Sequence, residues 1–134
     1  GKILNHQTAH CSVQITADRH YLPRKWTGRY WNHSCDPNTY MHTRSDGFPN
    51  LIASRNIRKG TEITYSYWMS EYAWSHGADE THVKCKCGSE VCKKRILAFS
   101  QLNAEEKKKL VDRKLCENYL VSLWKSGKRH LARI

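Results

Sequence analysis

The sequence predicts a mainly β protein with a C-terminal helix, and the spacing of its apolar residues is the reason. Between Cys11 and Tyr67, short apolar runs are separated by turns rich in Gly, Pro and Asn, as in small sheets of brief strands. After Asn103, apolar residues recur at three- to five-residue intervals, the spacing of an amphipathic helix. Hydrophobic residues make up 39% of the chain, including five Trp and seven Tyr, so we expect a packed core rather than disorder.

The strands are expected to be short and mostly antiparallel. Cys11–Ile15 alternates apolar and polar residues, which indicates a half-buried strand, and Asp18–Leu22 indicates a turn into a second one. The remaining predicted strands are Arg29–Trp31, Thr39–His42, one that begins at Leu51–Ala53, and Glu62–Tyr67. Residues 68–83 are rich in Trp, His and Glu but show no clean period, so they are predicted to form an ordered loop.

The C-terminal helix has a recognisable start and end. Asn103 is a predicted N-cap, with Glu106 three residues later as in a capping box. The apolar stripe that follows predicts a helix to about Lys125, ended near Gly127. We expect this stripe to pack on the β core; a helix that binds a partner protein is the alternative.

The charge of the chain is uneven. The net charge is +11, of which residues 1–83 contribute +2 (nine basic, seven acidic) and residues 84–134 contribute +9 (fourteen basic, five acidic). A basic half can mark a nucleic-acid partner, or it can compensate thiolates that bind a metal. If the partner is DNA, neutralising Lys107–Lys109 should weaken its binding. A length of 134 residues fits one domain.

Cellular location is bounded only loosely. No apolar run approaches the ~18 residues that span a bilayer, so no membrane partner is expected. No secretory signal is visible, which predicts an intracellular protein, with nucleus and cytoplasm both open.

Six cysteines in a chain without a secretory signal favour a metal site over a disulfide framework. Cys85-x-Cys87 brings two thiolates close together, and Cys92 can return to them after a turn at Gly88. Three soft ligands are one short of the four that structural zinc prefers. His76 or His82 is an alternative ligand, and three free thiols are the other interpretation. The remaining cysteines, Cys11 and Cys116, are expected to be buried thiols.

The segment Arg29–Thr39 concentrates functional side chains. Aromatic residues lead into the turn Asp36–Asn38, and Asn32, His33 and Cys35 lie on the bend between them. Main-chain groups at such a junction can bind a small molecule. A polar turn with a buried cysteine is the simpler interpretation.

Three motifs in order resemble those of SET-domain lysine methyltransferases. The run Asn32–Asn38, Asn-His-Ser-Cys-Asp-Pro-Asn, resembles the family signature Asn-His-Ser-Cys-x-Pro-Asn. Gly60–Tyr67 is similar to the family strand ending in Tyr-x-Tyr, and Cys85–Cys92 to its post-SET motif Cys-x-Cys-x4-Cys. The resemblance runs from about His10 to Ile96.

This resemblance implies a β-clip-like fold of small antiparallel sheets, with a threaded, knot-like active site and a post-SET zinc site. It divides the chain into a SET domain at 1–80, a post-SET zinc-binding segment at 81–97 and a C-terminal helical extension at 98–134. It also implies that Cys35 is the fourth ligand of one structural Zn²⁺, beside Cys85, Cys87 and Cys92.

The implied reaction transfers a methyl group from S-adenosyl-L-methionine to a lysine ε-amine of a protein. By resemblance, the cofactor-binding residues are Arg29, Asn32, His33 and Tyr67. Tyr67 is also the catalytic tyrosine that orients the transfer, and Tyr65 limits product size, favouring monomethylation. Trp68 and Trp74 could complete the aromatic wall of the lysine channel. Histones or nucleosomes are candidate substrates, with nucleic-acid contact through the basic C-terminal half.

The chain also departs from the family pattern. Ser66 stands where the family usually has Asp, at a position expected to face away from the two tyrosines. The N-terminal Gly-x-Gly segment is not visible, which predicts either a compact branch of the family or a chain lacking its first strands. Two other functions therefore stay open: a catalytically inactive, zinc-stabilised SET-like interaction module, and a SET-like enzyme that acts on a small molecule.

Overall fold

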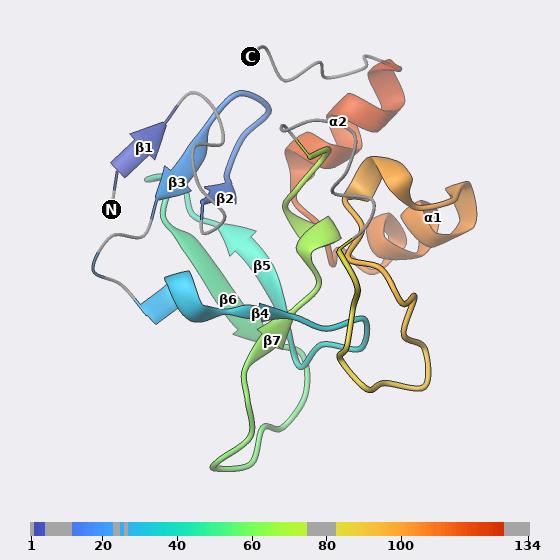
Figure 1. Cartoon of the computed structure of the whole chain (residues 1–134). Helices are drawn as coiled ribbons and strands as arrows, with labels where there is room; N and C mark the ends of the chain where they lie inside the picture. Colours follow the sequence, from blue (N-terminus) through green and yellow to red (C-terminus); the bar gives the residue numbers. More distant parts are fainter. Residues whose placement is uncertain (1, 5–11, 23–24, 26, 75–82, 128–134) are drawn as a thin grey trace.

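A computed structural model describes residues 2–4, 12–22, 25, 27–74 and 83–127 of the chain. It has the predicted class: small β-sheets followed by C-terminal helices (Figure 1). The first sheet is antiparallel, with strand order β1-β3-β2. Its strands are β1 (Lys2–Leu4), β2 (Val13–Gln14) and β3 (His20–Leu22). A second antiparallel pair joins β5 (Thr39–Thr43) to β6 (Pro49–Ala53).

The third pair is parallel and brings two of the sequence motifs together. Strand β4 (Asn32–His33) lies beside β7 (Thr64–Tyr65), with the β5–β6 hairpin between them in the sequence. Figure 1 shows β4 and β7 side by side at the centre of the ribbon. Ser66, which is fully buried, donates from its hydroxyl to the carbonyl of Ser34 at 2.7 Å and reinforces this pairing. Ser66 is therefore buried where β4 meets β7, and its direction relative to the two tyrosines stays a prediction.

The buried Asn38 fastens the turn after β4 to β7. Its amide nitrogen donates to the carbonyl of Glu62 at 2.8 Å, and its amide oxygen accepts from the N–H of Thr64 at 3.0 Å. One side chain thereby replaces a pair of ladder hydrogen bonds, so a two-residue strand pair is held in place.

Two strand predictions need correction. The predicted strand Arg29–Trp31 is wrong, because Thr27–Tyr30 forms a 3₁₀ helix closed by a bond from Trp31 N–H to the Gly28 carbonyl. Arg29 and Tyr30 are exposed, so this segment has no buried face that would hold a strand in a sheet. The predicted strand Glu62–Tyr67 is shortened to β7, since a second 3₁₀ helix begins at Tyr67.

The single predicted C-terminal helix is two helices, α1 (Ala104–Asp112) and α2 (Asn118–Ser126). The chain breaks near Lys114, whose φ of 55° is left-handed. Glu117 explains the break, because its backbone N–H donates to Met69 and its buried carboxylate accepts two hydrogen bonds from Thr43 of β5. A continuous helix could not make both contacts.

Both predicted ends of the helical region are confirmed. Asn103 caps α1 in a reciprocal capping box with Glu106. Gly127 ends α2 with a left-handed φ of 62°.

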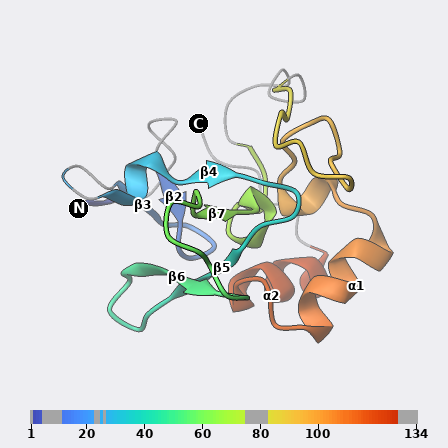
Figure 2. The ribbon, with the colours of Figure 1, turned by 90° about the horizontal axis from the view of Figure 1, so that it is seen from below.

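The core unites the sheets with the C-terminal helices. Phe99 and Leu120 have no exposed surface and share one apolar cluster with Val13 and Met41. Figure 2 shows α1 and α2 together on one side of the strands. The apolar stripe of α2 thus packs on the β core, as predicted. The boundaries 1–80, 81–97 and 98–134 remain predictions. No helix in the described part of the chain is long and apolar enough to cross a membrane.

Candidate functional site

The parallel β4–β7 pair forms one wall of a pocket of about 360 Å³. Asn32 and His33 contribute from β4, and Tyr67 contributes from the residues after β7. Cys85 and Lys86 close the pocket from the opposite, C-terminal segment. A volume in this range is typical of a site for a small molecule or cofactor. Three of the four predicted cofactor-binding residues therefore line one cavity.

Arg29, the fourth predicted cofactor-binding residue, is not among the residues that line this pocket. Its guanidinium lies over the exposed ring of Tyr30, 5.3 Å from the ring centroid. Sequence reasoning instead missed Glu62, which lines the pocket and accepts a hydrogen bond from the Asn32 amide at 2.7 Å. This contact fixes the orientation of the Asn32 carboxamide.

His33 lies between the pocket residue Tyr67 and the predicted metal ligand Cys35. Its Nδ1 accepts the backbone N–H of Tyr67 at 3.0 Å, so the ring proton lies on Nε2, which is 3.4 Å from the Cys35 sulfur. Burial lowers the pKa of His33 to about 4. The imidazole is therefore neutral at pH 7 and serves as a fixed bridge between Tyr67 and Cys35.

Aromatic rings surround Tyr67. Its ring centroid lies 5.1 Å from that of Tyr65, 5.2 Å from His33 and 6.4 Å from Trp74, and its hydroxyl donates to the Trp31 carbonyl at 3.0 Å. Burial raises the pKa of both tyrosines above the ordinary value. Both phenols are therefore protonated at neutral pH, and the single O–H of Tyr67 is used by the Trp31 carbonyl.

The predicted aromatic wall is formed in part. Trp74 contacts Tyr67 directly, whereas Trp68 is buried behind His33, with ring centroids 5.1 Å apart. Trp68 therefore supports the imidazole rather than facing Tyr67.

Glu71 is a further residue that sequence reasoning missed. Its side chain is 3% exposed, and its carboxylate accepts the backbone N–H of Gln14 at 2.8 Å. After burial, the negative charge of Glu71 is the next cause of the raised pKa values of Tyr65 and Tyr67. The sequence carried no signal for it, because a glutamate in an aperiodic segment is normally exposed.

The four predicted metal ligands form one cluster. The sulfur atoms of Cys35, Cys85, Cys87 and Cys92 all lie within 4.8 Å of one another, and those of Cys35 and Cys85 are 3.8 Å apart. Tetrahedral zinc with bonds of about 2.3 Å requires sulfur atoms about 3.8 Å apart. The donor set and its size therefore fit one Zn²⁺. The alternative ligands His76 and His82 lie outside the described residues.

Hydrogen bonds from the surrounding chain also suit thiolates. The backbone N–H groups of Lys93 and Lys94 donate to Cys35 and Cys92, each at 3.4 Å. The Ser89 hydroxyl lies 3.3 Å from the Cys87 sulfur. Such donors support ligand sulfur atoms in metal sites.

The thiols differ in acidity. Burial raises the pKa of Cys35 to about 12. Burial also raises the pKa of Cys87, but hydrogen bonds involving Ser89, Cys35 and Cys85 outweigh it and lower the pKa to about 5. A divalent cation would deprotonate all four thiols, and four sulfur ligands would leave no open position for water. The cluster therefore suits a structural ion rather than a catalytic one.

Cys116 is a partly buried thiol, and burial raises its pKa to about 11. Cys11 lies outside the described residues.

Comparison with known proteins agrees with the motifs. The family model described as "SET domain" matches residues 2–68, which is half of the chain, so this chain belongs to the SET-domain family. The cysteines Cys85, Cys87 and Cys92 lie beyond that match.

Several histone-lysine N-methyltransferases are similar to this chain. The eggless protein of Drosophila pseudoobscura pseudoobscura is 37% identical over 78 residues, covering 52% of this chain and 6% of that protein. ASHH3 of Arabidopsis thaliana is 38% identical over 71 residues, with 51% and 18% covered. The H3 lysine-36 specific enzyme of Debaryomyces hansenii is 35% identical over 79 residues, with 57% and 10% covered. The chain thus spans less than a fifth of each of these relatives.

Proposed function

We propose that this protein transfers a methyl group from S-adenosyl-L-methionine to the ε-amine of a lysine in a protein substrate. The observation that carries the proposal is the single pocket formed by Asn32, His33 and Tyr67, residues from two motifs that the β4–β7 pairing joins. The similar proteins named above are all histone-lysine N-methyltransferases, which supports the same reaction class.

The pocket is suited to the cofactor in size and polarity. Its volume of about 360 Å³ lies in the range of small-molecule sites, and Asn32 brings a polar group whose orientation Glu62 fixes. In this proposal Asn32 and His33 hold the cofactor, and Tyr67 faces its reactive end. When bound, S-adenosyl-L-methionine supplies an activated methyl group on a positively charged sulfur.

The residues around Tyr67 would prepare the lysine for attack. The amine must be neutral, yet free lysine has a pKa near ~10.4. Aromatic walls formed by Tyr65, Tyr67 and Trp74 disfavour the ammonium by desolvation, and its proton leaves to solvent. The neutral nitrogen would then be free to accept the methyl group that the bound cofactor would supply, with the departing sulfur keeping the bonding electron pair. Alignment of these atoms accounts for much of the remaining acceleration.

The two tyrosines have different roles in this proposal. The hydroxyl of Tyr67 is fixed by the Trp31 carbonyl, so it can orient the reacting groups. Tyr65 is 4% exposed and its ring is 5.1 Å from that of Tyr67, so it occupies the space that a second methyl group would need. Monomethylation is the expected product.

One Zn²⁺ held by the four clustered cysteines would have a structural role. It would join Cys35, which follows β4, to the segment that carries the other three ligands. Cys85 and Cys87 of that segment also line the pocket, so the ion would fix one wall of the cofactor site.

Histones are the substrate class that the similar proteins suggest. A histone substrate implies activity inside the cell, in the nucleus where chromatin is present. Other lysine-bearing proteins are the alternative within the same reaction class.

Calorimetric titration of S-adenosyl-L-methionine into the zinc-loaded protein tests the cofactor site. We expect micromolar binding that Asn32→Ala abolishes and that Asn56→Ala, at an exposed position, leaves unchanged. No binding to the unaltered protein would contradict the proposal and favour a non-catalytic, zinc-stabilised interaction module.

Methyl transfer to histones, followed by mass spectrometry, tests the chemistry. Tyr67→Phe should keep cofactor binding but lower the transfer rate by about 100-fold or more, the usual scale for losing one preorganised polar group at the reacting centre. Tyr30→Phe removes a hydroxyl from a ring that is 72% exposed and serves as the matched control. Transfer to small amines but to no protein would instead indicate an enzyme for small molecules.

A further inference from the structure

Basic residues gather on the segment that carries three of the four clustered cysteines. We call residues 83–96 the cysteine lobe. Two short stretches of the lobe run antiparallel, with the Cys85 N–H donating to the Lys94 carbonyl at 3.0 Å and the Ile96 N–H donating to the Val83 carbonyl at 2.9 Å. This pairing sets Lys84 directly opposite Arg95. Like charges in opposite positions destabilise a ladder, so the local fold alone does not favour this arrangement.

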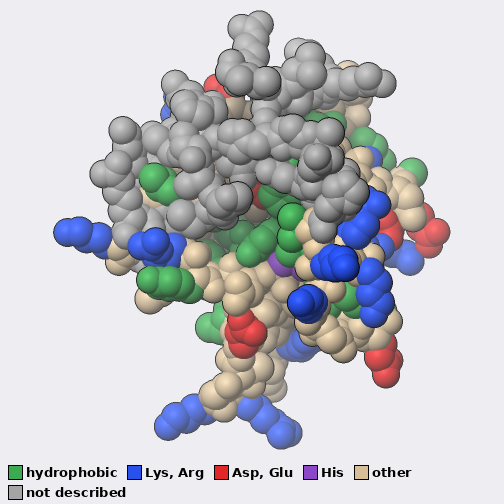
Figure 3. Space-filling view, in the orientation of Figure 1, with side chains coloured by type: hydrophobic (Ala, Val, Ile, Leu, Met, Phe, Trp, Pro, Cys, Tyr) green, Lys and Arg blue, Asp and Glu red, His purple; other side chains and the backbone are tan. Residues whose placement is uncertain are grey.

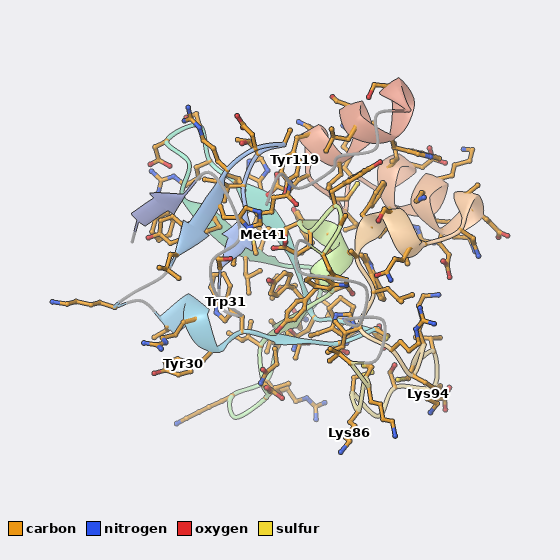
Figure 4. The ribbon with its side chains drawn as sticks, turned by 45° about the horizontal axis from the view of Figure 1, so that its top comes forward. Tyr30, Trp31, Met41, Lys86, Lys94 and Tyr119 are labelled. Atoms are coloured by element: carbon orange, nitrogen blue, oxygen red, sulfur yellow. The ribbon has the colours of Figure 1, made fainter. Side chains whose placement is uncertain are left out.

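The charges of the lobe point outward. Lys84, Lys86, Lys94 and Arg95 are all exposed, and within the described ranges no carboxylate forms an ion pair with any of them. Lys93 is different, because it pairs with Glu106 of α1. Figure 3 shows one group of Lys and Arg side chains at the right of the visible face, besides others at its left and bottom. Figure 4 shows Lys86 and Lys94 extending from the same end of the molecule.

Metal binding accounts for only part of this charge. The lobe contains five basic residues and one acidic residue, Glu90, for a net charge of +4. A Zn²⁺ with four thiolates carries −2, including the thiolate of Cys35. A surplus of +2 therefore remains around the cluster, and the basic side chains lie at the surface.

The basic residues of α1 do not form a comparable surface. Lys107 donates to the Ser100 carbonyl and lies over the Phe99 ring. Two other lysines of α1 form ion pairs within the helix: Lys108 with Asp112, and Lys109 with Glu105. The contact expected at Lys107–Lys109 from the sequence is therefore better assigned to the lobe.

We propose that the cysteine lobe binds the phosphate backbone of a nucleic-acid duplex through Lys84, Lys86, Lys94 and Arg95. Long, flexible and exposed cationic side chains suit phosphates, which supply affinity without reading the sequence. Binding of single strands relies on stacking against aromatic side chains, and residues 83–96 contain no aromatic residue.

The position of the lobe links this surface to the pocket. Lys86 and Ile96 of the lobe line the pocket that Asn32 and Tyr67 also line. A duplex bound to the lobe would thus lie beside the proposed methyl-transfer site and would favour protein substrates attached to nucleic acid. The binding itself requires neither cofactor nor methyl transfer, so it can be tested even if the proposed reaction is wrong.

Fluorescence anisotropy of a labelled 20-base-pair duplex, without cofactor, tests the proposal. Four phosphate contacts predict a slope of about −3.6 for log K against log salt, which is a loss of about 100-fold in affinity between 50 and 200 mM salt. The triple variant Lys84→Gln, Lys94→Gln and Arg95→Gln should reduce the slope to about −1. Its affinity at 50 mM salt should fall by at least about tenfold.

A matched variant controls for net charge. Lys108→Gln, Lys109→Gln and Arg113→Gln remove an equal number of charges from α1 and its C-cap, so the net charge falls from +11 to +8 in both variants. We expect its affinity to stay within about twofold of the unaltered protein. Equal losses in the two variants would overturn the proposal, because binding would then follow net charge alone.

Two further measurements keep the test decisive. The charge-preserving variant Lys84→Arg, Lys94→Arg and Arg95→Lys should bind the duplex as the unaltered protein does, which separates the effect of lost charge from that of a misfolded lobe. If this charge-preserving variant folds but does not bind, the proposal is contradicted. Polyglutamate of equal charge serves as a competitor. If it displaces the duplex at equal charge concentration, the surface fits an acidic protein, and the nucleic-acid assignment is wrong.

Discussion

The cysteine lobe and helix α2 both follow β7 in the chain, but different interactions hold them against the rest of the protein. In the lobe, Cys85 is the only buried residue, and Val83 and Val91 remain 47% and 64% exposed. In α2, by contrast, Leu120 is fully buried and Leu123 is 9% exposed. Apolar packing therefore holds α2 in place, whereas the lobe has little of it and gathers its three sulfur atoms with that of Cys35 at one centre.

This difference predicts that the stability of the lobe depends on a bound metal ion and that the stability of α2 does not. Apolar burial is worth about 1.5–3 kcal/mol per large side chain and depends little on small ligands. A set of four thiols contributes fully only when a cation holds it together, because otherwise the thiols are simply clustered polar groups. The pocket wall formed by Cys85 and Lys86 should therefore depend on the metal, whereas the contact between α2 and β5 should not.

Metal removal should have the largest effect. Structural zinc sites are worth on the order of 10 kcal/mol, so a strong chelator or Cys87→Ser should lower the thermal unfolding temperature sharply. Cys116→Ser changes a partly buried thiol outside the cluster and should cost only about 1 kcal/mol. Differential scanning calorimetry with measured zinc content compares the two. Similar losses would mean that the cluster is not a metal site.

Leu120→Ala should have the next largest effect. It removes a fully buried side chain and should cost about 2–5 kcal/mol, measured by urea unfolding. Val91→Ala in the lobe should change stability by less than about 0.5 kcal/mol. The zinc content of Leu120→Ala should stay at one ion per chain. Loss of zinc from this variant would show that the lobe and α2 are not stabilised independently.

Asn103→Ala tests the link between the regions, since α1 lies between them in the sequence. Asn103 accepts the Glu106 N–H at 2.8 Å, and its loss should cost about 1 kcal/mol. Asn118→Ala, at the exposed first position of α2, is the matched change without an N-cap role. Urea unfolding measures both; a larger loss for Asn118→Ala would show that capping does not limit the stability of α1.

Glu117→Gln should give the smallest effect, visible as a change with pH. Burial raises the pKa of Glu117, so its folded value lies above its unfolded value. Its contribution to stability is then fully present below about pH 4.5 and is lost as pH rises through the folded value. Gln keeps an oxygen that can accept from Thr43 but does not ionise. The stability of the variant relative to the unaltered protein should therefore increase from pH 4 to pH 7. A difference that stays constant over this range would contradict a buried, ionisable Glu117.

The sequence by itself determined the local features of this protein. Short sequence patterns predict the N-cap at Asn103, the end of α2 at Gly127 and the hairpin strands around residues 39–53. These patterns depend only on residues that are neighbours in the chain. Close spacing also identified Cys85, Cys87 and Cys92 as a candidate metal site. Cys35, Asn32 and His33 are predicted from the resemblance to the SET-domain family.

Only the tertiary structure decided how these pieces combine. The parallel pairing of β4 with β7, the break before α2 and the buried carboxylates of Glu71 and Glu117 depend on partners far away in the chain. It also assigned Arg29 to the surface and the ring proton of His33 to Nε2. Hydrogen bonding and burial act between neighbours in space, and local spacing carries no information about which distant residue becomes a neighbour.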